Sequence, residues 1–289
     1  QTKPMTNTPE TESWDLIITP RKKWYDLQLP DVWRYRDLIA LFVRRDFVSR
    51  YKQTILGPLW FLIQPLLTSV VFTVIFGNIA QLPTDGLPQL LFYMSGNVLW
   101  GYFSSCLTST SNTFVSNARL FGKVYFPRLV MPISTVISNL ITFAIQFLFF
   151  LGFFIYFFLS GADIRISLWA LSLPLLVFLM AGLGLGFGII ISSLTTKYRD
   201  LTYLVSFGVS LWMYATPVII PVSSFPERWR WVADLNPVTP IIETFRAGFL
   251  GAGDASWGRL GYSGIFMLVV LFIGVVIFNR VEKTFIDTV

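Results

Sequence analysis

The side chains best suited to chemistry are uncharged polar groups that recur along otherwise apolar segments. In residues 89–114 they are spaced alternately by four and three, which places them on one face of a helix. Amides and hydroxyls on such a face donate and accept hydrogen bonds without carrying charge. Three segments have polar positions of this kind: Asn97, Gly101, Ser104, Thr108 and Ser111; Thr135, Asn139, Thr142 and Gln146; and Gln64 with Thr68.

These faces have two interpretations. They can line a hydrated path for a neutral polymer, whose sugar rings would lie on aromatic side chains, or they can pack helices against one another through small and polar residues. The first interpretation gives these candidate path residues: Gln64, Tyr93, Asn97, Trp100, Tyr102, Phe103, Ser104, Trp212 and Tyr214.

Several kinds of chemistry are excluded by what the sequence lacks. There is no histidine and only one cysteine, Cys106, so no multi-cysteine metal cluster and no histidine-based catalysis are expected. We therefore predict no catalytic residue, metal site or cofactor in this chain.

A source of energy is also missing from the chain. No Asp or Glu falls inside an apolar segment, and Arg259 is the one cation at the mouth of such a segment, so ion-coupled transport is not expected. Gly122-Lys123 lacks the glycine spacing of a phosphate-binding loop. Any uphill movement must therefore be driven by another polypeptide.

The elements that position these residues are predicted to be membrane helices. Apolar residues make up 54% of the chain and charged residues 13%, whereas soluble domains average about 25% charged residues. The sequence therefore predicts an all-α integral membrane protein with six transmembrane helices, since about 20 apolar residues cross a bilayer. The expected spans are 59–80, 89–114, 129–159, 168–194, 201–220 and 257–279.

Two segments precede the six-span domain, which we assign to residues 57–289. Residues 1–30 are polar with interfacial aromatics, and residues 31–56 are expected to form an amphipathic helix. This helix can lie in the headgroup layer or pack on a partner subunit. Gly57-Pro58 is expected to end it and to open the first span.

The charges indicate an orientation. Most Lys and Arg residues outside the apolar segments lie on the side that holds the N-terminus. The positive-inside rule therefore places both termini in the cytoplasm. Because the cations flank membrane spans, the net charge of +6 is not expected to mark a nucleic-acid site.

A short helix is expected before the last span. Thr239 can cap it, Pro240 fits its first turn and Gly251 can end it. It is too short to cross a bilayer, which indicates a re-entrant or interfacial helix. Glu243 and Arg246 can pair on one face, either in a plain interfacial anchor or in an outer gate.

Two further segments have paired interpretations. Residues 119–128 form a basic, aromatic loop that is either an ordinary positive-inside loop or a docking element for a cytoplasmic motor. Gly182, Gly184, Gly186 and Gly188 allow close helix packing, within the subunit or with a second copy.

Several motifs together resemble the permease subunits of type-2 ABC polysaccharide exporters, most closely the O-antigen exporter permeases. They are WRYRDL at 33–38, RRD at 44–46, RYKQTILG at 50–57, Trp60 with Gln64-Pro65-Leu66, and LNPVTPIIETFR at 235–246. The resemblance covers about residues 31 to 289 and is carried by the motifs in combination.

The resemblance implies a homodimer with two copies of a separate cytoplasmic ABC ATPase, which would bind ATP and magnesium. It implies a multi-pass protein of the bacterial inner membrane that exports an undecaprenyl-diphosphate-linked polysaccharide through an aromatic channel in contact with membrane lipid. It also implies ATPase contacts from the N-terminal helix and the basic loop, at Arg44, Arg45, Arg50, Arg119, Phe121, Lys123, Tyr125 and Arg128.

Alternatives remain within and outside this class. Teichoic-acid, capsule, drug or lipid exporters share the architecture. A membrane-embedded glycosyl- or acyltransferase would need acid–base residues near the membrane face. The outer carboxylates, such as Asp85 and Glu243, are scattered and have no histidine beside them.

Overall fold

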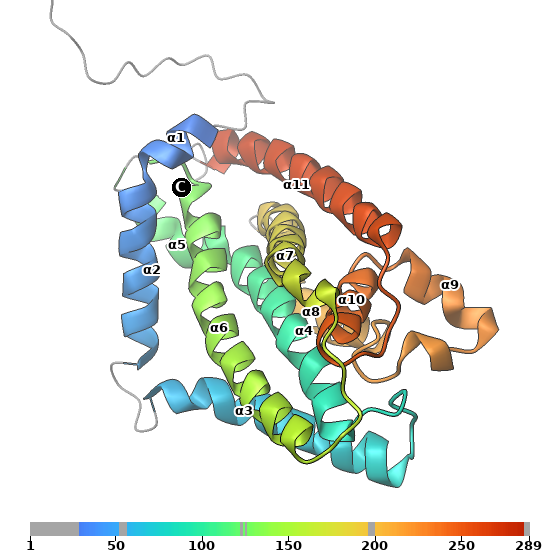
Figure 1. Ribbon diagram of the computed structural model, residues 1–289. Helices are drawn as coiled ribbons and strands as arrows, with labels where there is room; N and C mark the ends of the chain where they lie inside the picture. Colours follow the sequence, from blue (N-terminus) through green and yellow to red (C-terminus); the bar gives the residue numbers. More distant parts are fainter. Residues whose placement is uncertain (1–28, 52–56, 122–123, 125, 196–199, 286–289) are drawn as a thin grey trace, which may run out of the picture.

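The computed structural model describes residues 29–51, 57–121, 124, 126–195 and 200–285, with some side chains at helix ends left out. This part of the chain is built from helices and contains no strand (Figure 1). The helices are α1 (Leu29–Arg34), α2 (Arg36–Tyr51), η1 (Gly57–Leu59), α3 (Trp60–Phe72), η2 (Thr73–Ile79), α4 (Gln89–Ser111), α5 (Thr113–Phe121), α6 (Val130–Leu159), η3 (Leu168–Ser172), α7 (Leu173–Thr195), α8 (Leu201–Tyr214), η4 (Val222–Ser224), α9 (Glu227–Leu235), α10 (Thr239–Phe249) and α11 (Trp257–Phe285).

The predicted fold class, an all-α integral membrane protein, is confirmed. Four helical stretches are long and apolar enough to cross a membrane: Trp60–Ile79, Val130–Leu159, Leu168–Thr195 and Trp257–Arg280. They coincide with four of the six predicted spans to within one or two residues. The first stretch joins α3 to η2, which is a π-helix.

The other two predicted spans are also helices. α4 has 23 residues, enough to cross a bilayer, but its polar face makes it less apolar than the four stretches above. α8 has 14 residues and ends at Tyr214 instead of the expected Ile220. Pro217 cannot continue a helix, and the Asn236 amide donates to the Ala215 carbonyl 3.2 Å away. The chain beyond α8 is therefore drawn into the core.

The centre of the subunit is α7, which lies between α4 and α11 (Figure 1). Its glycines face both neighbours. A Cβ on Gly184 would lie 2.6 Å from the Cβ of Cys106 on α4, and one on Gly186 would lie 2.9 Å from Val270 Cγ1 on α11. The glycines thus pack helices within the subunit, the first of the two alternatives that the sequence left open.

The amphipathic segment packs on the spans of its own chain. α2 lies along the first half of α6, and α3 crosses the ends of α4 and α6 (Figure 1). α1 begins at Leu29 and is separated from α2 by a turn at Tyr35. Gly57 has a φ of +48°, a conformation that glycine adopts without strain. It stands where the sequence predicted the break before the first span.

The segment before α11 contains two helices, of which α10 is the more deeply packed. α10 starts at Thr239 as expected, with Pro240 in its first turn. Thr239 does not cap it. Instead, Asn236 Oδ1 accepts a hydrogen bond of 3.0 Å from the backbone N–H of Val238. Gly251, at φ +76°, ends the helix and donates its N–H to the Arg246 carbonyl.

Candidate functional site

An uncharged cleft of about 390 Å³ lies where α3, α4 and α6 meet, with one residue from α8. It brings together the three polar faces that the sequence singled out. Its wall contains no Asp, Glu, Lys or Arg. The lining residues are Trp60, Phe61, Gln64, Pro65, Thr68, Asn97, Trp100, Gly101, Tyr102, Ser104, Ser105, Asn139, Thr142, Phe143, Gln146 and Met213.

Two amides of the cleft also hold its helices together. The Asn97 side chain of α4 donates to the Ser69 hydroxyl of α3 over 3.0 Å. The Gln146 side chain of α6 donates to the Phe61 carbonyl of α3 over 3.2 Å. These bonds join helices, as the packing alternative requires, and the same two side chains line the cleft. A polar face can therefore serve both purposes.

Aromatic rings form one side of the cleft. Trp100 and Tyr102 line it, and Tyr102 lies against Phe143 with ring centroids 5.2 Å apart. Phe103 and Trp212 are behind this surface. The centroid of Trp212 is 6.2 Å from Trp100 and 5.1 Å from Phe103. The second pair therefore supports Trp100 without lining the cleft.

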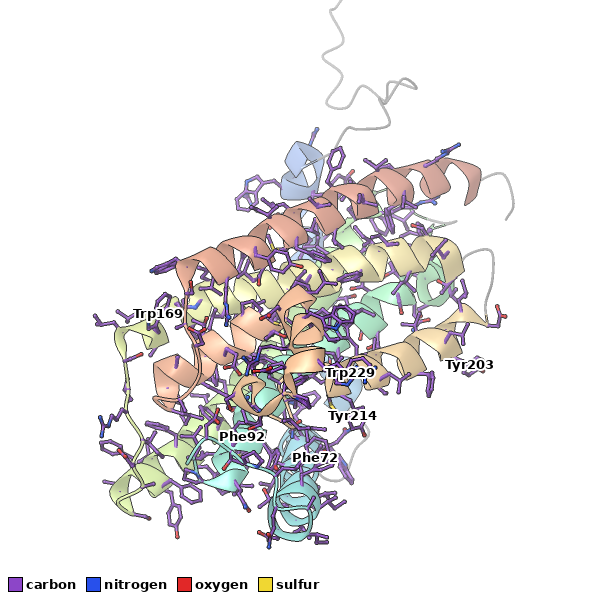
Figure 2. The ribbon with its side chains drawn as sticks, turned by 90° about the vertical axis from the view of Figure 1, so that its right-hand side faces the viewer. Phe72, Phe92, Trp169, Tyr203, Tyr214 and Trp229 are labelled. Atoms are coloured by element: carbon purple, nitrogen blue, oxygen red, sulfur yellow. The ribbon has the colours of Figure 1, made fainter. Side chains whose placement is uncertain are left out.

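Two predicted path residues lie elsewhere. Tyr93 is fully buried against Phe72 and Phe92, away from the cleft. Tyr214 is 57% exposed and lies near the end of α8 (Figure 2). Both are on helices that contribute to the cleft region, but helix membership alone did not reveal which way each side chain points.

The cleft also contains residues outside the predicted path set. Thr142 and Gln146 belong to a polar face that the sequence shows clearly. Trp60, Phe61 and Met213 carry no such signal, because an aromatic or Met residue in an apolar helix commonly faces lipid or core.

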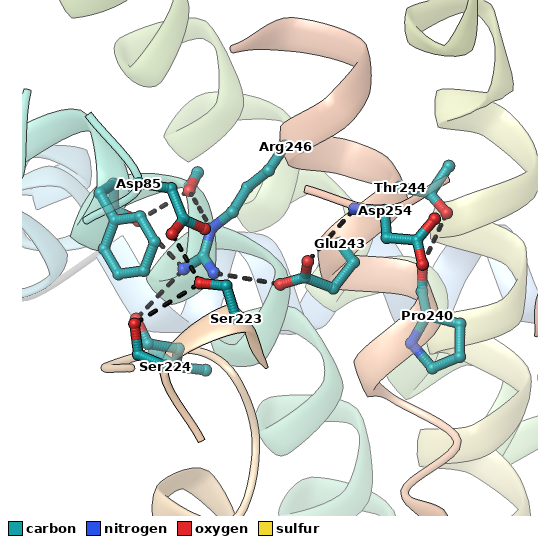
Figure 3. Close-up of polar contacts among 11 residues, drawn as sticks. Asp85, Ser223, Ser224, Pro240, Glu243, Thr244, Arg246 and Asp254 are labelled. Carbon is teal, nitrogen blue, oxygen red and sulfur yellow. Dashed lines mark hydrogen bonds and ion pairs between the residues drawn. The ribbon is translucent and has the colours of Figure 1, made fainter. Parts of the chain in front are cut away.

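A buried ion pair lies within α10 (Figure 3). Arg246 Nη1 lies 3.6 Å from Glu243 Oε1, and the two side chains are 2% and 5% exposed. The predicted pairing on one helix face is therefore present. The guanidinium also lies over the Phe92 ring, 3.7 Å from its centroid.

The remaining donors of Arg246 bind two other segments. Its Nε donates to the Ser95 hydroxyl of α4 over 3.2 Å, and its Nη2 donates to the carbonyls of Phe92 and Val218. Burial lowers the pKa of Arg246 to about 10, and the nearby Glu243 carboxylate opposes that change. The side chain thus remains charged at neutral pH and ties three segments together.

The partner carboxylate is held in a similar way. Glu243 Oε2 accepts the backbone N–H of Asp254 over 3.3 Å. Burial raises the pKa of Glu243, and Arg246 and this hydrogen bond counteract the rise. Close by, the Ser223 hydroxyl donates to Asp85 over 2.6 Å, which links the turn before α4 to the turn before α9 (Figure 3).

The short helix predicted before the last span is packed inside the subunit. Nearly every residue of α10 is buried, and the helix packs on α4, α7, α11 and η3. Glu243 and Arg246 are fastened inside the protein, so any outer gate built on them has to move α10 as a whole.

Three of the docking candidates, Arg45, Phe121 and Arg128, gather around an aromatic cluster between α2 and the loop before α6. The Arg45 guanidinium lies 4.8 Å from the Phe42 ring centroid, and the Phe42 ring is 5.8 Å from that of Phe126. Phe121 extends the cluster, with Arg128 at 5.4 Å from its ring centroid. Arg128 is only 6% exposed. It therefore supports the cluster more than it presents a surface.

The other docking candidates are placed less fully. Arg44 is exposed on α2, beside a separate groove. Arg50 and Arg119 are within helices, but their side chains are not described, and Lys123 and Tyr125 lie outside the described residues. Among the residues that the structure does describe, no group of three or more His, Cys, Asp or Glu could hold a metal ion.

Comparison with known proteins places these features in a family. The sequence model of the ABC-2 type transporter family matches residues 37–250. The chain is 29% identical to the O-antigen export system permease protein RfbA of Klebsiella pneumoniae over 256 residues, which is 87% of this chain and 94% of the relative.

Two more distant relatives align over similar lengths. The O-antigen export system permease protein RfbA of Myxococcus xanthus is 27% identical over 76% of this chain and 82% of its own. The polysialic acid transport protein KpsM of Escherichia coli is 24% identical over 86% of this chain and 95% of its own. The matched family region contains the cleft, the ion pair and most of the aromatic cluster, and the chain belongs to the ABC-2 type transporter family.

Proposed function

We propose that this chain is the channel-forming transmembrane subunit of an ATP-driven exporter that moves a lipid-linked polysaccharide of the O-antigen type across the bacterial inner membrane. The observation that carries the proposal is the cleft between α3, α4 and α6, with its amides, hydroxyls and aromatic rings and no charged side chain. The permeases named for O-antigen export and polysialic acid transport support a polysaccharide as the substrate class.

The chemistry of the cleft suits a sugar polymer. Hydroxyl groups of a glycan exchange hydrogen bonds with amides such as Asn97 and Gln146, while the apolar C–H faces of the sugar rings lie against aromatic side chains such as Trp100. A charged wall would bind an ionic substrate and hold it in place. Neutral groups let a long chain exchange one hydrogen bond for the next as it moves.

The proposal includes partners that would supply the energy and complete the pore. A second copy of this chain would complete the channel, and two copies of a cytoplasmic ABC ATPase would bind ATP and magnesium. The substrate would be carried on undecaprenyl diphosphate. Both termini would face the cytoplasm, in keeping with the excess of cations on that side.

Blocking the cleft tests the transport path. A Cβ on Gly101 would meet only Gln146 Oε1 at 3.8 Å. Gly101→Ala is therefore expected to be tolerated, whereas Gly101→Phe must place its ring in the cleft. In a deletion strain carrying each variant, we expect Gly101→Phe to remove nearly all surface polysaccharide and to accumulate lipid-linked polymer inside the cell. Immunoblotting of surface and internal fractions measures both.

Gly208→Phe is the matched control, because nothing lies within 4 Å of a Cβ at that exposed helix position. It should export at the wild-type level. Normal export by Gly101→Phe at normal protein abundance would contradict the proposed path. A deletion strain with unchanged surface polysaccharide would contradict the function itself, and accumulation of a drug or lipid would favour the alternative exporter class.

Charge reversal at Arg45 tests the ATPase-docking surface. Arg45 is partly exposed at the edge of the Phe42–Phe126 cluster. Arg45→Glu is expected to weaken the complex with the ATPase roughly a hundredfold, because a like charge across an interface costs several kcal/mol. The measurement is ATPase copurification and transport-coupled ATP hydrolysis. Arg228→Glu, on exposed α9, is the control. If both variants lost ATPase binding equally, Arg45 would have no specific docking role.

A further inference from the structure

Two sets of apolar side chains lie along α1, α2 and the turn between them. Tyr35, Leu38 and Phe42 pack into the cluster formed with the loop before α6 and the first turn of that helix. A second set, which includes Trp33 of α1 and Val43 of α2, lines an open groove between these two helices and α6. Trp33 is 70% exposed, so its end of the groove is not covered by the residues that the structure describes.

The groove is large and its far wall belongs to a membrane span. Its volume is about 690 Å³, within the range of roughly 300–1,000 Å³ typical of ligand pockets. On α6 it is lined by Ile133, Ile137 and Ile141, which follow one another by one helical turn. These isoleucines lie in the stretch Val130–Leu159 that is apolar enough to cross a membrane. The groove is therefore open to the layer that contains lipid chains.

Two cations stand at the rim of this apolar groove. Among the described residues that line the groove, Arg36 and Arg44 are the charged ones, and they are eight residues apart on α2, about 12 Å along the helix axis. Arg44 is exposed and makes no ion pair or hydrogen bond with the described residues. Arg36 lies 3.9 Å from Asp37 in a highly exposed pair, which is worth little. The Arg36 guanidinium also lies 5.9 Å from the centroid of the Trp33 ring, but its side chain is still 64% exposed, so both arginines can donate hydrogen bonds to an anion.

We propose that the α2–α6 groove binds an anionic phospholipid, with one acyl chain along the α6 isoleucines and the phosphate held by Arg36 and Arg44. An acyl chain needs no hydrogen-bonding partner, and the walls between the two arginines offer almost none. An extended peptide in the same place would leave backbone N–H and C=O groups without partners. The cationic rim selects an anionic headgroup over a zwitterionic one. This site is separate from the cleft and does not depend on what the cleft transports.

Photolabelling of the full chain in lipid nanodiscs tests the site. The probe is phosphatidylglycerol with a photoreactive diazirine on one acyl chain, compared with phosphatidylcholine that carries the same group. We expect phosphatidylglycerol to label residues of α2 and the first half of α6, and phosphatidylcholine to label them weakly. Equal labelling by both lipids would overturn the charge-based selection. A cross-link to α2 or α6 of a second copy across the groove would identify protein as the occupant and overturn the proposal.

Two kinds of variant separate the headgroup contact from the acyl-chain contact. The double variant Arg36→Gln, Arg44→Gln is expected to lower the affinity for phosphatidylglycerol roughly thirtyfold, because it removes two cations beside an anionic headgroup. Ile137→Trp should fill the groove and displace the acyl chain. Arg45→Gln and Leu148→Trp are the matched controls, since they lie on the same two helices outside the groove lining. Native mass spectrometry counts the retained lipids, and circular dichroism confirms that each variant is folded.

The outcomes decide the proposal in both directions. Loss of lipid in both groove variants, with retention in both controls, supports it. Lipid retained by Ile137→Trp but lost from the arginine variant would mean that the headgroup binds at the surface without the groove. If the arginine variant retained the lipid, then Arg36 and Arg44 would not be the residues that recognise the headgroup. Either result would overturn the site as proposed.

Discussion

Replacing Arg246 with leucine is expected to lower the free energy of unfolding by about 3–5 kcal/mol, the usual cost of removing one partner of a buried ion pair. The variant leaves the Glu243 carboxylate buried without its counter-charge. It also removes donors from the Ser95 hydroxyl and from the carbonyls of Phe92 and Val218. Thermal and denaturant unfolding of the detergent-solubilised chain, followed by circular dichroism, measures the loss.

Three further variants define the cause. Arg246→Lys keeps the charge but loses the planar guanidinium group, so the free energy of unfolding of this variant should lie between those of Arg246→Leu and the wild type. Glu243→Leu combined with Arg246→Leu should recover part of the stability, because no unpaired charge stays buried. Arg165→Leu breaks an exposed pair with Asp163, at 80% and 82% exposure, and should cost no more than about 1 kcal/mol. If Arg246→Leu cost as little as Arg165→Leu, the buried pair would not fasten α10.

Gly184→Val is expected to destabilise the subunit nearly as strongly, by separating α7 from α4. Even the first carbon of a side chain would lie 2.6 Å from Cys106 Cβ and 3.0 Å from the Phe103 carbonyl oxygen. Both are fixed parts of the neighbouring helix, so the helices must move apart. Inserting carbon into a packed core typically costs about 1–3 kcal/mol, and occasionally more. A fall in melting temperature and in folded yield would show this.

Gly152→Val is the matched control on another apolar helix. Nothing lies within 4 Å of a Cβ at Gly152, which is exposed on α6. At this position valine replaces glycine, the poorest helix former apart from proline, so the free energy of unfolding should stay the same or rise slightly. Similar melting temperatures for the two valine variants would mean that contact between α4 and α7 tolerates a side chain, contrary to the packing described.

Hydropathy predicted the membrane helices well because the transfer of apolar side chains out of water is the largest favourable free-energy term for these segments. The predicted span at residues 129–159 matches Val130–Leu159 to one residue. The shorter α8 has a local cause, since Pro217 and the Asn236 hydrogen bond end it early. The predicted span at 257–279 agrees with the stretch Trp257–Arg280, and α11 continues beyond it to Phe285 because polar residues do not stop a helix. A drop in hydropathy predicts the edge of a membrane better than the end of a helix.

The part of the candidate site that is formed by residues on one face of a single helix could be predicted from the sequence. The spacing of Asn97 and Ser104 placed them on one face, and the structure puts both on the cleft. Arg246 was different. It was expected to pair with Glu243 on one helix face, but its other partners, Ser95 and Phe92, are 151 and 154 residues earlier in the chain. Only the tertiary fold brings them together, so the periodicity of α10 could not reveal its burial.

Because α11 follows α7 in the chain, the contacts between these two helices form only after α11 has been synthesised. When α7 is inserted, one of its glycine faces can pack on α4. The other face, at Gly182 and Gly186, has no contact until Met267 and Val270 of α11 are in place. A nascent chain released before residue 257 keeps that second face open to lipid, which cannot reproduce such close backbone contact. A chain truncated before residue 257 would therefore lack the helix that covers this side of α7.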